Sequence, residues 1–519
     1  MKTITSIFFF FYGFAFLSQS NKLEWGSLAK PSSELYKVMA LEGNDFVTLR
    51  GPANQFASSY RLEYRSNLEV LTKGNISIKL ENGIANFENA LTIGNRIYVL
   101  LNDVYEKTNS IYIQEYTADL KPIDIPRALV TIEFDSRRNK GSFFIEQSKD
   151  KNYFVLLWEI PGQKEERDRY GFKIFDKNLV ELNSGDYKLP FEGANTTIDQ
   201  HILSNSGDYF ISVTEYFPIE KKGIFRKEQH FKAVHLLQVH EEGLEDFVIN
   251  MEEKRVEALQ LETNDAGLFT AVGVYGDKGT NGAKGLFHLF VDFKKKQITH
   301  QGFEDFSEEF ITKNWNEKQL EKANRDKMNG KGNPLLHNFV MRDVFLTAEG
   351  NLVGSIEQYY TQVVSYTDSR GYSRSTTYYY YNDIICFKIK KDGGFEWINR
   401  IPKNQASVND GGFYSSYFSF LEKDQLKIIF NDHLGNYDRE GEAEDVINYS
   451  FSTGKKNAVG MLSVDLETGN YDRRALFKGK DEEAIIIPRF FKWNTQKDQI
   501  LFYARFGRKE RFGRYYLSK

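Results

Sequence analysis

MALEGNDFVTL, residues 39–49, consists of a short apolar strand, a polar turn and a second strand, and this arrangement recurs along the chain. Asn, Asp and Gly in the turn tolerate the positive φ that tight hairpins demand, and the alternating apolar residues around it bury one face of each strand. Eight such matches are far more specific together than any one of them. The other seven are ALTIGNRIYVLL (90–101), FIEQSKDKNYFVLL (144–157), HILSNSGDYFISV (201–213), LQLETNDAGLFTAV (259–272), VFLTAEGNLVGSI (344–356), SFLEKDQLKIIF (419–430) and FFKWNTQKDQILFYA (490–504).

A second hairpin follows the first in most copies, as in RLEYRSNLEVL (61–71) and FKIFDKNLVEL (172–182). Two hairpins per repeat make a four-stranded antiparallel unit, which is the blade of a β-propeller. A tandem array of β-sandwiches is the rival fold, but it would show spacer segments and less regular units. The sequence therefore predicts an all-β chain that forms a single propeller of eight blades, with seven as the alternative.

The two ends of the chain supply the strands that such a ring still lacks. After the eighth hairpin one more strand remains, RFGRYYLSK (511–519), so the last blade has no outer strand. NKLEWGSLA (21–29) is a spare strand before the first repeat. Pairing these two segments would close the ring and cover an edge that otherwise invites aggregation. We expect the N-terminal strand to complete the last blade.

Residues 1–20 have the layout of a secretory signal peptide, with Lys2, an apolar run from Ile7 to Leu17, and small residues at Ser18 and Ser20. The run is shorter than the ~20 residues of a membrane-spanning helix. Removing this segment changes the formal net charge from −4 to −5, and a mildly acidic chain gives no reason to expect nucleic acid as a partner. We expect an exported protein, periplasmic, cell-surface or secreted, whose propeller domain occupies residues 21–519 and does not span a membrane.

Two further features concern the fold, a helical insertion and a single cysteine. Residues 305–329 are expected to form a helical insertion that leans on the ring between the fifth and sixth blades, starting with a capping box from Asp305 to Glu308. The single cysteine, Cys386, lies in an apolar run and is interpreted as a small buried hydrophobic residue.

The sixth blade contains the most unusual composition of the chain, a Tyr-rich hairpin at residues 356–386. Alternation predicts that one set of its tyrosines faces a neighbouring blade while the other faces solvent. Tyr offers a large rigid area, a hydroxyl and few rotors to freeze, so the hairpin is a candidate recognition element; cross-strand aromatic pairs that only stabilise the hairpin are the alternative. The candidate binding residues are Tyr359, Tyr360, Tyr366, Arg370, Tyr372, Tyr378 and Tyr380.

Other charged segments favour structural interpretations. In the acidic segment 431–445, Asn436 and Asp438 match the first half of a calcium loop, but Ile447 stands where the closing acid belongs, so a solvated loop is favoured. The basic C-terminal segment 505–514 is interpreted as a hairpin with a basic outer face, with an anionic glycan or lipid as the alternative partner. His230, His235 and His240 recur at an odd spacing, which places successive residues on opposite faces of a strand. We therefore expect no metal site and no cofactor.

NDIICFKIKKDGGFEWINRIPKNQ (382–405) and NDGGFYSSYFSF (409–420), together with the Tyr-rich hairpin, resemble uncharacterised exported propeller proteins of Bacteroidetes from about Glu34 onward. This resemblance implies a propeller fold and an envelope location, and it assigns no activity and no site residue.

Neither a nucleophile elbow nor a phosphate-binding loop nor a zinc-protease motif is present in the sequence. The leading hypothesis is a binding or scaffold propeller for a protein or glycan partner in the cell envelope. The alternatives are a carbohydrate-active enzyme with acidic residues in the central funnel, and a sensor or assembly component of the envelope. Paired carboxylates in an aromatic funnel would favour the enzyme, and a funnel plugged by apolar side chains would favour the scaffold.

Overall fold

The computed structural model describes most of residues 22–517. The ranges outside the description are 1–21, 52–59, 81–82, 163–167, 222–226, 229, 250, 264–268, 294, 296, 314, 330–332, 368–372, 438–445, 495–496 and 518–519. The expected signal peptide therefore lies outside the described residues. Within the described part of the chain, every helix is too short or too polar to cross a membrane.

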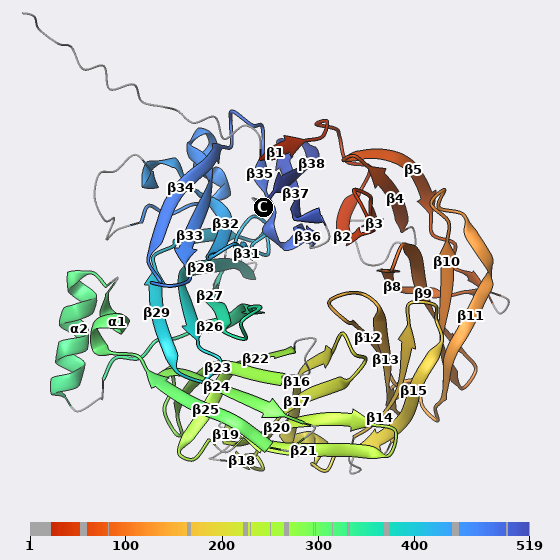
Figure 1. The fold of residues 1–519 in the computed structure, drawn as a ribbon, viewed down its shortest axis with the longest axis horizontal. Helices are drawn as coiled ribbons and strands as arrows, with labels where there is room; N and C mark the ends of the chain where they lie inside the picture. Colours follow the sequence, from red (N-terminus) through yellow and green to blue (C-terminus); the bar gives the residue numbers. More distant parts are fainter. Residues whose placement is uncertain are drawn as a thin grey trace, which may run out of the picture.

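The described strands form eight antiparallel sheets of four or more strands, arranged as blades around a central opening (Figure 1). This is the predicted eight-bladed propeller. The first four blades are β2 (Glu34–Ala40), β3 (Phe46–Gly51), β4 (Arg61–Ser66) and β5 (Glu69–Asn75); β8 (Asn86–Ile93), β9 (Arg96–Tyr105), β10 (Thr108–Tyr116) and β11 (Pro122–Glu133); β12 (Phe143–Gln147), β13 (Tyr153–Ile160), β14 (Arg169–Asp176) and β15 (Glu181–Lys188); and β16 (Thr196–Leu203), β17 (Tyr209–Tyr216), β20 (Phe231–His240) and β21 (Gly243–Ile249).

The second half of the ring repeats the same order, from the innermost strand outward. Its blades are β22 (Lys254–Thr263), β23 (Phe269–Asp277), β24 (Gly285–Asp292) and β25 (Gln297–Asp305); β26 (Phe339–Leu346), β27 (Leu352–Thr367), β28 (Ser373–Ile389) and β29 (Phe395–Ile401), with β30 (Gln405–Val408) beside β28; β31 (Tyr417–Glu422), β32 (Gln425–His433), β33 (Asn457–Asp465) and β34 (Tyr471–Lys478); and β35 (Ile485–Ile486) with β36 (Lys492–Asn494), β37 (Gln499–Phe506), β38 (Lys509–Tyr516) and β1 (Leu23–Trp25).

The last blade is completed by the N-terminal strand, as the sequence predicts. β1 pairs antiparallel with β38, and Trp25 lies opposite Gly513. The Trp25 ring makes an edge contact with Phe477 at 5.8 Å between ring centroids, and the Arg511 guanidinium lies 4.5 Å from its centroid. Figure 1 shows β1 beside β38 at the point where the two ends of the ring meet.

Apolar side chains fill the spaces between blades. Each of the eight clusters of buried hydrophobic residues draws its members from two neighbouring blades, so every seam of the ring has a core of its own. The seam between the first and last blades contains Phe46 and Phe512, whose ring centroids lie 5.0 Å apart. Cys386 is buried in the seam between the sixth and seventh blades, as expected for a small hydrophobic residue.

All eight predicted hairpins are present as the two innermost strands of the eight blades. Glycines occupy the positive-φ position in four of their turns, at Gly43, Gly94, Gly207 and Gly350. These glycines avoid the steric cost that a Cβ atom brings in this region of φ/ψ space.

The helical insertion differs in detail from the prediction. It holds two helices, α1 (Glu308–Thr312) and α2 (Glu317–Met328), which protrude from the outside of the ring (Figure 1). Asp305 belongs to β25 and accepts a hydrogen bond from Tyr275, so Ser307 caps α1 instead. The capping box lies further on and caps α2. As expected, α1 packs against the seam between the fifth and sixth blades.

The C-terminal residues 505–514 form the expected hairpin, in which the exposed basic residues are Arg508 and Lys509, whereas Arg505 is partly buried and Arg514 is buried. β1 covers this strand, and the Arg514 guanidinium is 3% exposed and donates to the Asn44 carbonyl at 2.7 Å. Arg505 pairs with Glu34 at 2.7 Å. These arginines therefore bind their own neighbours within the ring, because the strand pairing that covers them comes from the other end of the chain.

Candidate functional site

The two faces of the propeller differ in the length of their connections. On one face, here called the short-turn face, each turn joins the first strand of a blade to the second, or the third strand to the fourth. These turns are short, from two residues (67–68) to five residues (41–45). The opposite face, here called the long-loop face, carries the Tyr-rich hairpin, the helical insertion (306–338) and the connection 434–456. Because loops held on a rigid scaffold commonly carry function, the long-loop face is the candidate binding face.

The innermost strands of five blades contain a β-bulge near their long-loop ends. In each one the register shifts past a single extra residue. Bulges bend a strand and re-aim its side chains, and they are common beside functional sites. The extra residues are Tyr36, Glu88, Asp199, Glu257 and Arg342.

Residues that follow these bulges reach the next blade. The Lys37 ammonium of the first blade donates to Asn89 Oδ1 of the second at 3.0 Å. In the fourth blade, Gln200 Oε1 accepts a hydrogen bond from the Leu261 backbone N–H of the fifth at 2.7 Å. The inner rim of the ring is thus joined by polar contacts between neighbouring blades.

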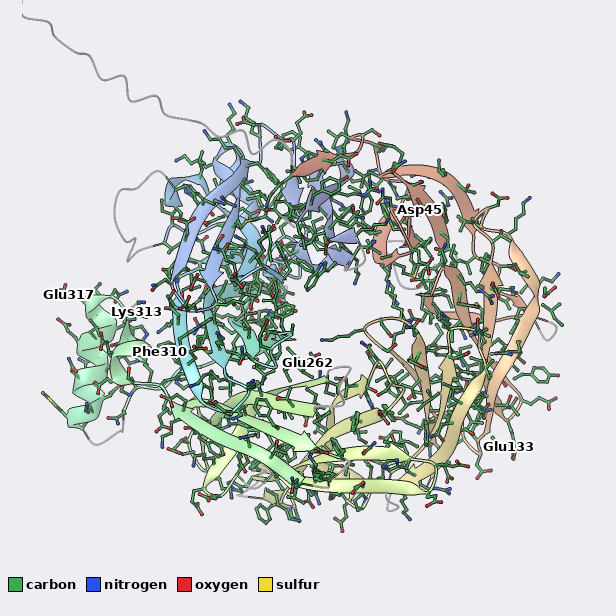
Figure 2. The ribbon with its side chains drawn as sticks, viewed as in Figure 1. Asp45, Glu133, Glu262, Phe310, Lys313 and Glu317 are labelled. Carbon is green, nitrogen blue, oxygen red and sulfur yellow. The ribbon has the colours of Figure 1, made fainter. Side chains whose placement is uncertain are left out.

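The turn 148–152 between β12 and β13 extends toward the centre of the ring at the short-turn face (Figure 1). Its Lys149 ammonium lies 2.5 Å from a carboxylate oxygen of Glu262 in the fifth blade, which faces the central opening (Figure 2). Its Lys151 ammonium donates to the Ala40 carbonyl of the first blade at 3.0 Å. The third blade therefore makes polar contacts with the first and the fifth blades through two lysine side chains at this end of the channel.

Three carboxyl groups near the channel have raised pKa values. Burial is the largest cause at Glu146, Glu262 and Asp343. Lys149 counteracts burial at Glu262 and Asp343, and Ser419 donates a hydrogen bond to Asp343. These are the channel carboxylates that the enzyme hypothesis would have to use.

A cavity of about 660 Å³ opens at the seam between the first and last blades. The 3₁₀ helix η4 (Pro488–Phe490) interrupts the innermost strand of the last blade and places the Arg489 guanidinium 4.2 Å from the centroid of Phe413. The cavity is lined by Glu34, Leu35, Tyr36, Lys37, Val38, Phe413, Arg489, Phe490 and Lys492.

The Tyr-rich hairpin is formed by the outer halves of β27 and β28, and its strand register sorts the predicted tyrosines onto two faces. Tyr360 stacks on Tyr380, with ring centroids 4.7 Å apart and planes inclined by 19°. Tyr378 extends this stack, 6.5 Å from Tyr380 with planes inclined by 18°. We call Tyr360, Tyr378 and Tyr380 the tyrosine ladder.

Tyr359 lies on the opposite face of the hairpin, where its ring packs on Tyr381 at 4.7 Å and the Arg342 guanidinium lies 5.8 Å from its centroid. The division of the tyrosines between the two faces follows the predicted alternation. Tyr366 lies opposite Arg374 in the register of β27 and β28.

Arg370 and Tyr372, the remaining predicted binding residues, lie outside the described residues, as does most of the acidic segment that resembles a calcium loop.

A smaller polar cavity of about 330 Å³ adjoins the ladder. Tyr360 forms part of its wall, and Trp315, from the link between α1 and α2, forms another part. In the base of this cavity, Arg400 pairs with Asp383 at 2.7 Å. Tyr360 of the ladder and Trp315 of the helical insertion therefore line one cavity beside the sixth blade.

Val364 and Val408 extend the surface of the ladder with aliphatic area. They are 41% and 49% exposed, and the strand register places both on the same side of the sheet as the ladder. Sequence reasoning found the tyrosines but missed these valines, because single aliphatic residues in strands carry no signal of their own.

The three histidines in β20 and just before it have different environments. His235 is buried, with Nδ1 2.9 Å from an Asp246 carboxylate oxygen, whereas His230 and His240 are exposed. Groups of three or more His, Cys, Asp or Glu side chains with metal-binding geometry were not found among the described residues.

Comparisons with known proteins find only distant similarity to solved structures. No family model and no curated protein matches the chain. The chain is similar to the WD40 domain of SCAP from fission yeast (8% identity, TM-score 0.37, covering 96% of this chain and 94% of that one), to the β-propeller domain of Nup133 from Vanderwaltozyma polyspora (11%, 0.31, 82% and 99%) and to a protein of unknown function from Bacteroides caccae (11%, 0.25, 69% and 94%). It spans 58% of the length of a dihydro-heme d1 dehydrogenase, NirN (11%, 0.35), which covers 72% of this chain.

Proposed function

We propose that this propeller is an exported binding module of the cell envelope, and that its ligand surface is the tyrosine ladder with the adjoining face of the helical insertion. The observation that carries this proposal is the half-buried ladder on a hairpin that extends from the long-loop face. Stacked tyrosines on a rigid hairpin give contact area at a small entropic cost, since each side chain has only two rotatable bonds to fix.

The aliphatic neighbours of the ladder favour a protein partner over a glycan. Val364 and Val408 present methyl groups beside the tyrosine rings, and protein interfaces bury such mixtures of aromatic and aliphatic area at their centres.

A triple variant of the ladder tests the proposal. Tyr360→Ser, Tyr378→Ser and Tyr380→Ser are combined, and the purified variant is compared with the unchanged protein as bait for envelope extracts and on a glycan array. Tyr105→Ser is the matched control, because Tyr105 is 47% exposed beside another connection of the long-loop face. We expect a protein partner that the triple variant loses and the control retains. Equal capture by all three proteins would refute the proposal, and loss of a glycan signal alone would replace the protein partner with a glycan.

Export is tested separately. N-terminal sequencing of the protein recovered from cell fractions should give a chain that begins at Asn21 in the envelope or medium. A full-length chain in the cytosol would contradict export.

The second candidate is a carbohydrate-active enzyme. One observation favours it: burial raises the pKa values of Glu262 and Asp343, and the charge of Lys149 acts on both carboxyl groups. A buried carboxyl group with a raised pKa can act as a general acid in glycoside cleavage. Incubation with a panel of polysaccharides should then release reducing ends, and Glu262→Gln should abolish the release. If the unchanged protein releases none, this candidate fails and the binding module stands.

A further inference from the structure

The cavity between the first and last blades combines a cationic wall with an aromatic wall. β2 contributes Lys37, and β36 contributes Lys492. Phe413 and Phe490 form apolar surface in the same cavity. Its volume of about 660 Å³ falls in the range of small-molecule sites, which is roughly 300–1,000 Å³.

The ammonium groups around this cavity have neutral hydrogen-bond acceptors. Lys37 donates to Asn89 Oδ1 at 3.0 Å and to the Ala90 carbonyl at 2.7 Å. Lys151, from the turn at the short-turn face, donates to the Ala40 carbonyl. Because buried charges usually lie beside charges of opposite sign, amide oxygens alone leave this cluster with an excess of positive charge.

Nearby carboxylates offset this excess only in part. Glu34 lines the cavity, but it pairs with Arg505 at 2.7 Å. Glu146 acts on Lys37 through space, although burial raises the pKa of this carboxyl. For Lys492, the described residues provide neither an ion pair nor a hydrogen bond to its ammonium.

The pKa values show that the lysines repel one another. Burial is the largest cause that lowers the pKa of Lys37 and of Lys151 to about 8, and the charge of the neighbouring Lys492 is the next. The charge of Lys151 lowers the pKa of Lys37 further. Burial also lowers the pKa of Lys492. At neutral pH both Lys37 and Lys151 are still mostly protonated, so a bound anion would relieve an existing electrostatic cost.

The aromatic wall makes an organic anion a better fit than an inorganic one. Arg489 lies over Phe413 at 4.2 Å and over Phe490 at 5.1 Å, and Arg505 lies over Phe413 at 5.0 Å. These rings offer apolar contact to the uncharged part of a ligand, while the guanidinium of Arg489 can add a charged hydrogen bond.

We propose that this cavity binds a small organic anion, a carboxylate or a phosphate ester, with its charged group between Lys37 and Lys492 and its apolar part against Phe413 and Phe490. This site lies at the inner rim of the ring and is separate from the tyrosine ladder. Either site can therefore fail its test without affecting the other.

Isothermal titration calorimetry on the full protein tests the proposal. Phenyl phosphate and benzoate are the probes, and their comparison distinguishes a phosphate ester from a carboxylate. Two partial probes are included for comparison: inorganic phosphate has the charge without the ring, and benzyl alcohol has the ring without the charge. We expect at least one aromatic anion to bind at least ten-fold more tightly than either partial probe. Equal affinity for benzyl alcohol, or no binding of either anion below 10 mM, would overturn the proposal.

Variants locate the site. Lys492→Met and Arg489→Met should each weaken anion binding at least ten-fold, and Arg489 is exposed enough for its replacement to leave the fold intact. Lys177→Met is the matched control, because it removes one exposed positive charge from a turn of the short-turn face. Unchanged binding in both cavity variants, or an equal loss in the control, would show that the anion binds elsewhere.

The pH dependence gives a further readout. A bound anion favours the protonated lysines, so affinity should be highest below pH 8 and should fall as the pH rises above 8. The charged groups that act on Lys37 are Lys492, Glu146 and Lys151, and of these Lys151 titrates in the same range. Affinity that does not change between pH 7 and pH 9.5 would contradict the proposed site.

Discussion

A buried ion-pair network joins the first blade to the last, and its loss should weaken the whole ring. Arg50 on β3 is fully buried and donates to Glu63 Oε2 of its own blade at 2.6 Å. Its guanidinium also forms a two-pronged pair with Glu510 of the last blade, with Nη1 at 3.2 Å from Oε2. Tyr503 donates to the same carboxylate at 2.6 Å. The two blades are thus held together by residues 460 positions apart in the chain.

Replacing Arg50 with Met removes the nearest cation of Glu510, which stays buried beside Tyr503 with only Arg65 at 4.0 Å as a cationic neighbour. Glu63 keeps Arg65, at 2.8 Å, as its partner. Removing one member of a buried ion pair costs about 3–5 kcal/mol, chiefly because the remaining charge is buried without compensation. We therefore expect Arg50→Met to lower the free energy of unfolding by about 3–5 kcal/mol.

Arg50→Met combined with Glu510→Met should be much less destabilised, because no uncompensated charge remains at the seam. Replacing both members of a buried pair by apolar groups of similar volume is often neutral or better. The double variant should recover about 2 kcal/mol or more of the loss, a coupling typical of residues in direct contact.

Urea unfolding followed by circular dichroism measures these differences. Arg169→Met is the matched control, because Arg169 pairs with Asp186 at 2.5 Å while both side chains are about half exposed. Such surface pairs contribute roughly 0–1 kcal/mol. A loss in Arg50→Met no larger than in this control would refute the assignment of the network as a closing contact.

Three further predictions concern the closing strand and the first blade. Trp25→Ala removes the packing of the N-terminal strand on Phe477 and should lower the free energy of unfolding by about 2–3 kcal/mol, less than for a fully buried Trp, as urea unfolding will show. Burial opposes ionisation of Glu63, but Arg50 and Arg65 outweigh burial and lower the pKa of Glu63 from 4.5 to about 2. Between these two pH values the unfolded chain binds more protons than the folded protein, so about 3 kcal/mol of the stability present above pH 4.5 should be lost as the pH falls toward 2. Glu63→Gln should not show this loss when its stability is measured in an acid titration. Burial lowers the pKa of Lys37 from 10.5 to about 8, so the free energy of unfolding should rise as the pH increases from 8 to 10.5. Lys37→Met should remove this rise and should increase the free energy of unfolding at pH 7, measured in urea, by at most about 3 kcal/mol.

The ring and its closure could be predicted from sequence because their signals are local. A tight turn needs positive φ at a fixed place, and Gly43, Gly94 and Gly207 mark that place in the sequence. The closing strand was recognised because the last repeat ended one strand short and a spare strand preceded the first. Both inferences depend on counting units within the chain and on no contact between distant side chains.

The bulges could not be predicted, because an extra residue in a strand has no fixed residue type. Tyr36, Glu88 and Arg342 occupy equivalent places in three blades and share no chemistry. The start of the helical insertion was predicted wrongly, because a capping pattern in the sequence does not reveal a competing strand pairing. Asp305 pairs within the sheet as part of β25, and the capping box forms at Asn316, at the start of α2.

The candidate site was found only in part. Alternation sorted the tyrosines correctly, because strand geometry alone determines which residues share a face. Lys37 and Lys492 were missed, since they meet only after the ring has closed and lie in segments with no common motif. The same cause misled the interpretation of Arg505 and Arg514, whose partners Glu34 and Asn44 come from the opposite end of the chain.

The cavity and the closing seam occupy one place, so anion binding should be linked to ring stability. One wall of the cavity belongs to the first blade and the other to the last, and an anion between Lys37 and Lys492 would bind the closed ring and not the opened one. A ligand that binds only the folded state stabilises it by about 2.7 kcal/mol at a concentration 100-fold above its Kd. Phenyl phosphate at that concentration should therefore restore most of the melting temperature lost in Arg50→Met, as measured by calorimetry. Adding Lys492→Met to that variant should reduce the stabilisation by the ligand to about 1.4 kcal/mol or less, because a ten-fold weaker site is only 10-fold above its Kd at the same concentration and the Arg50 network is untouched. Equal rescue in both variants would mean that the anion acts away from the seam.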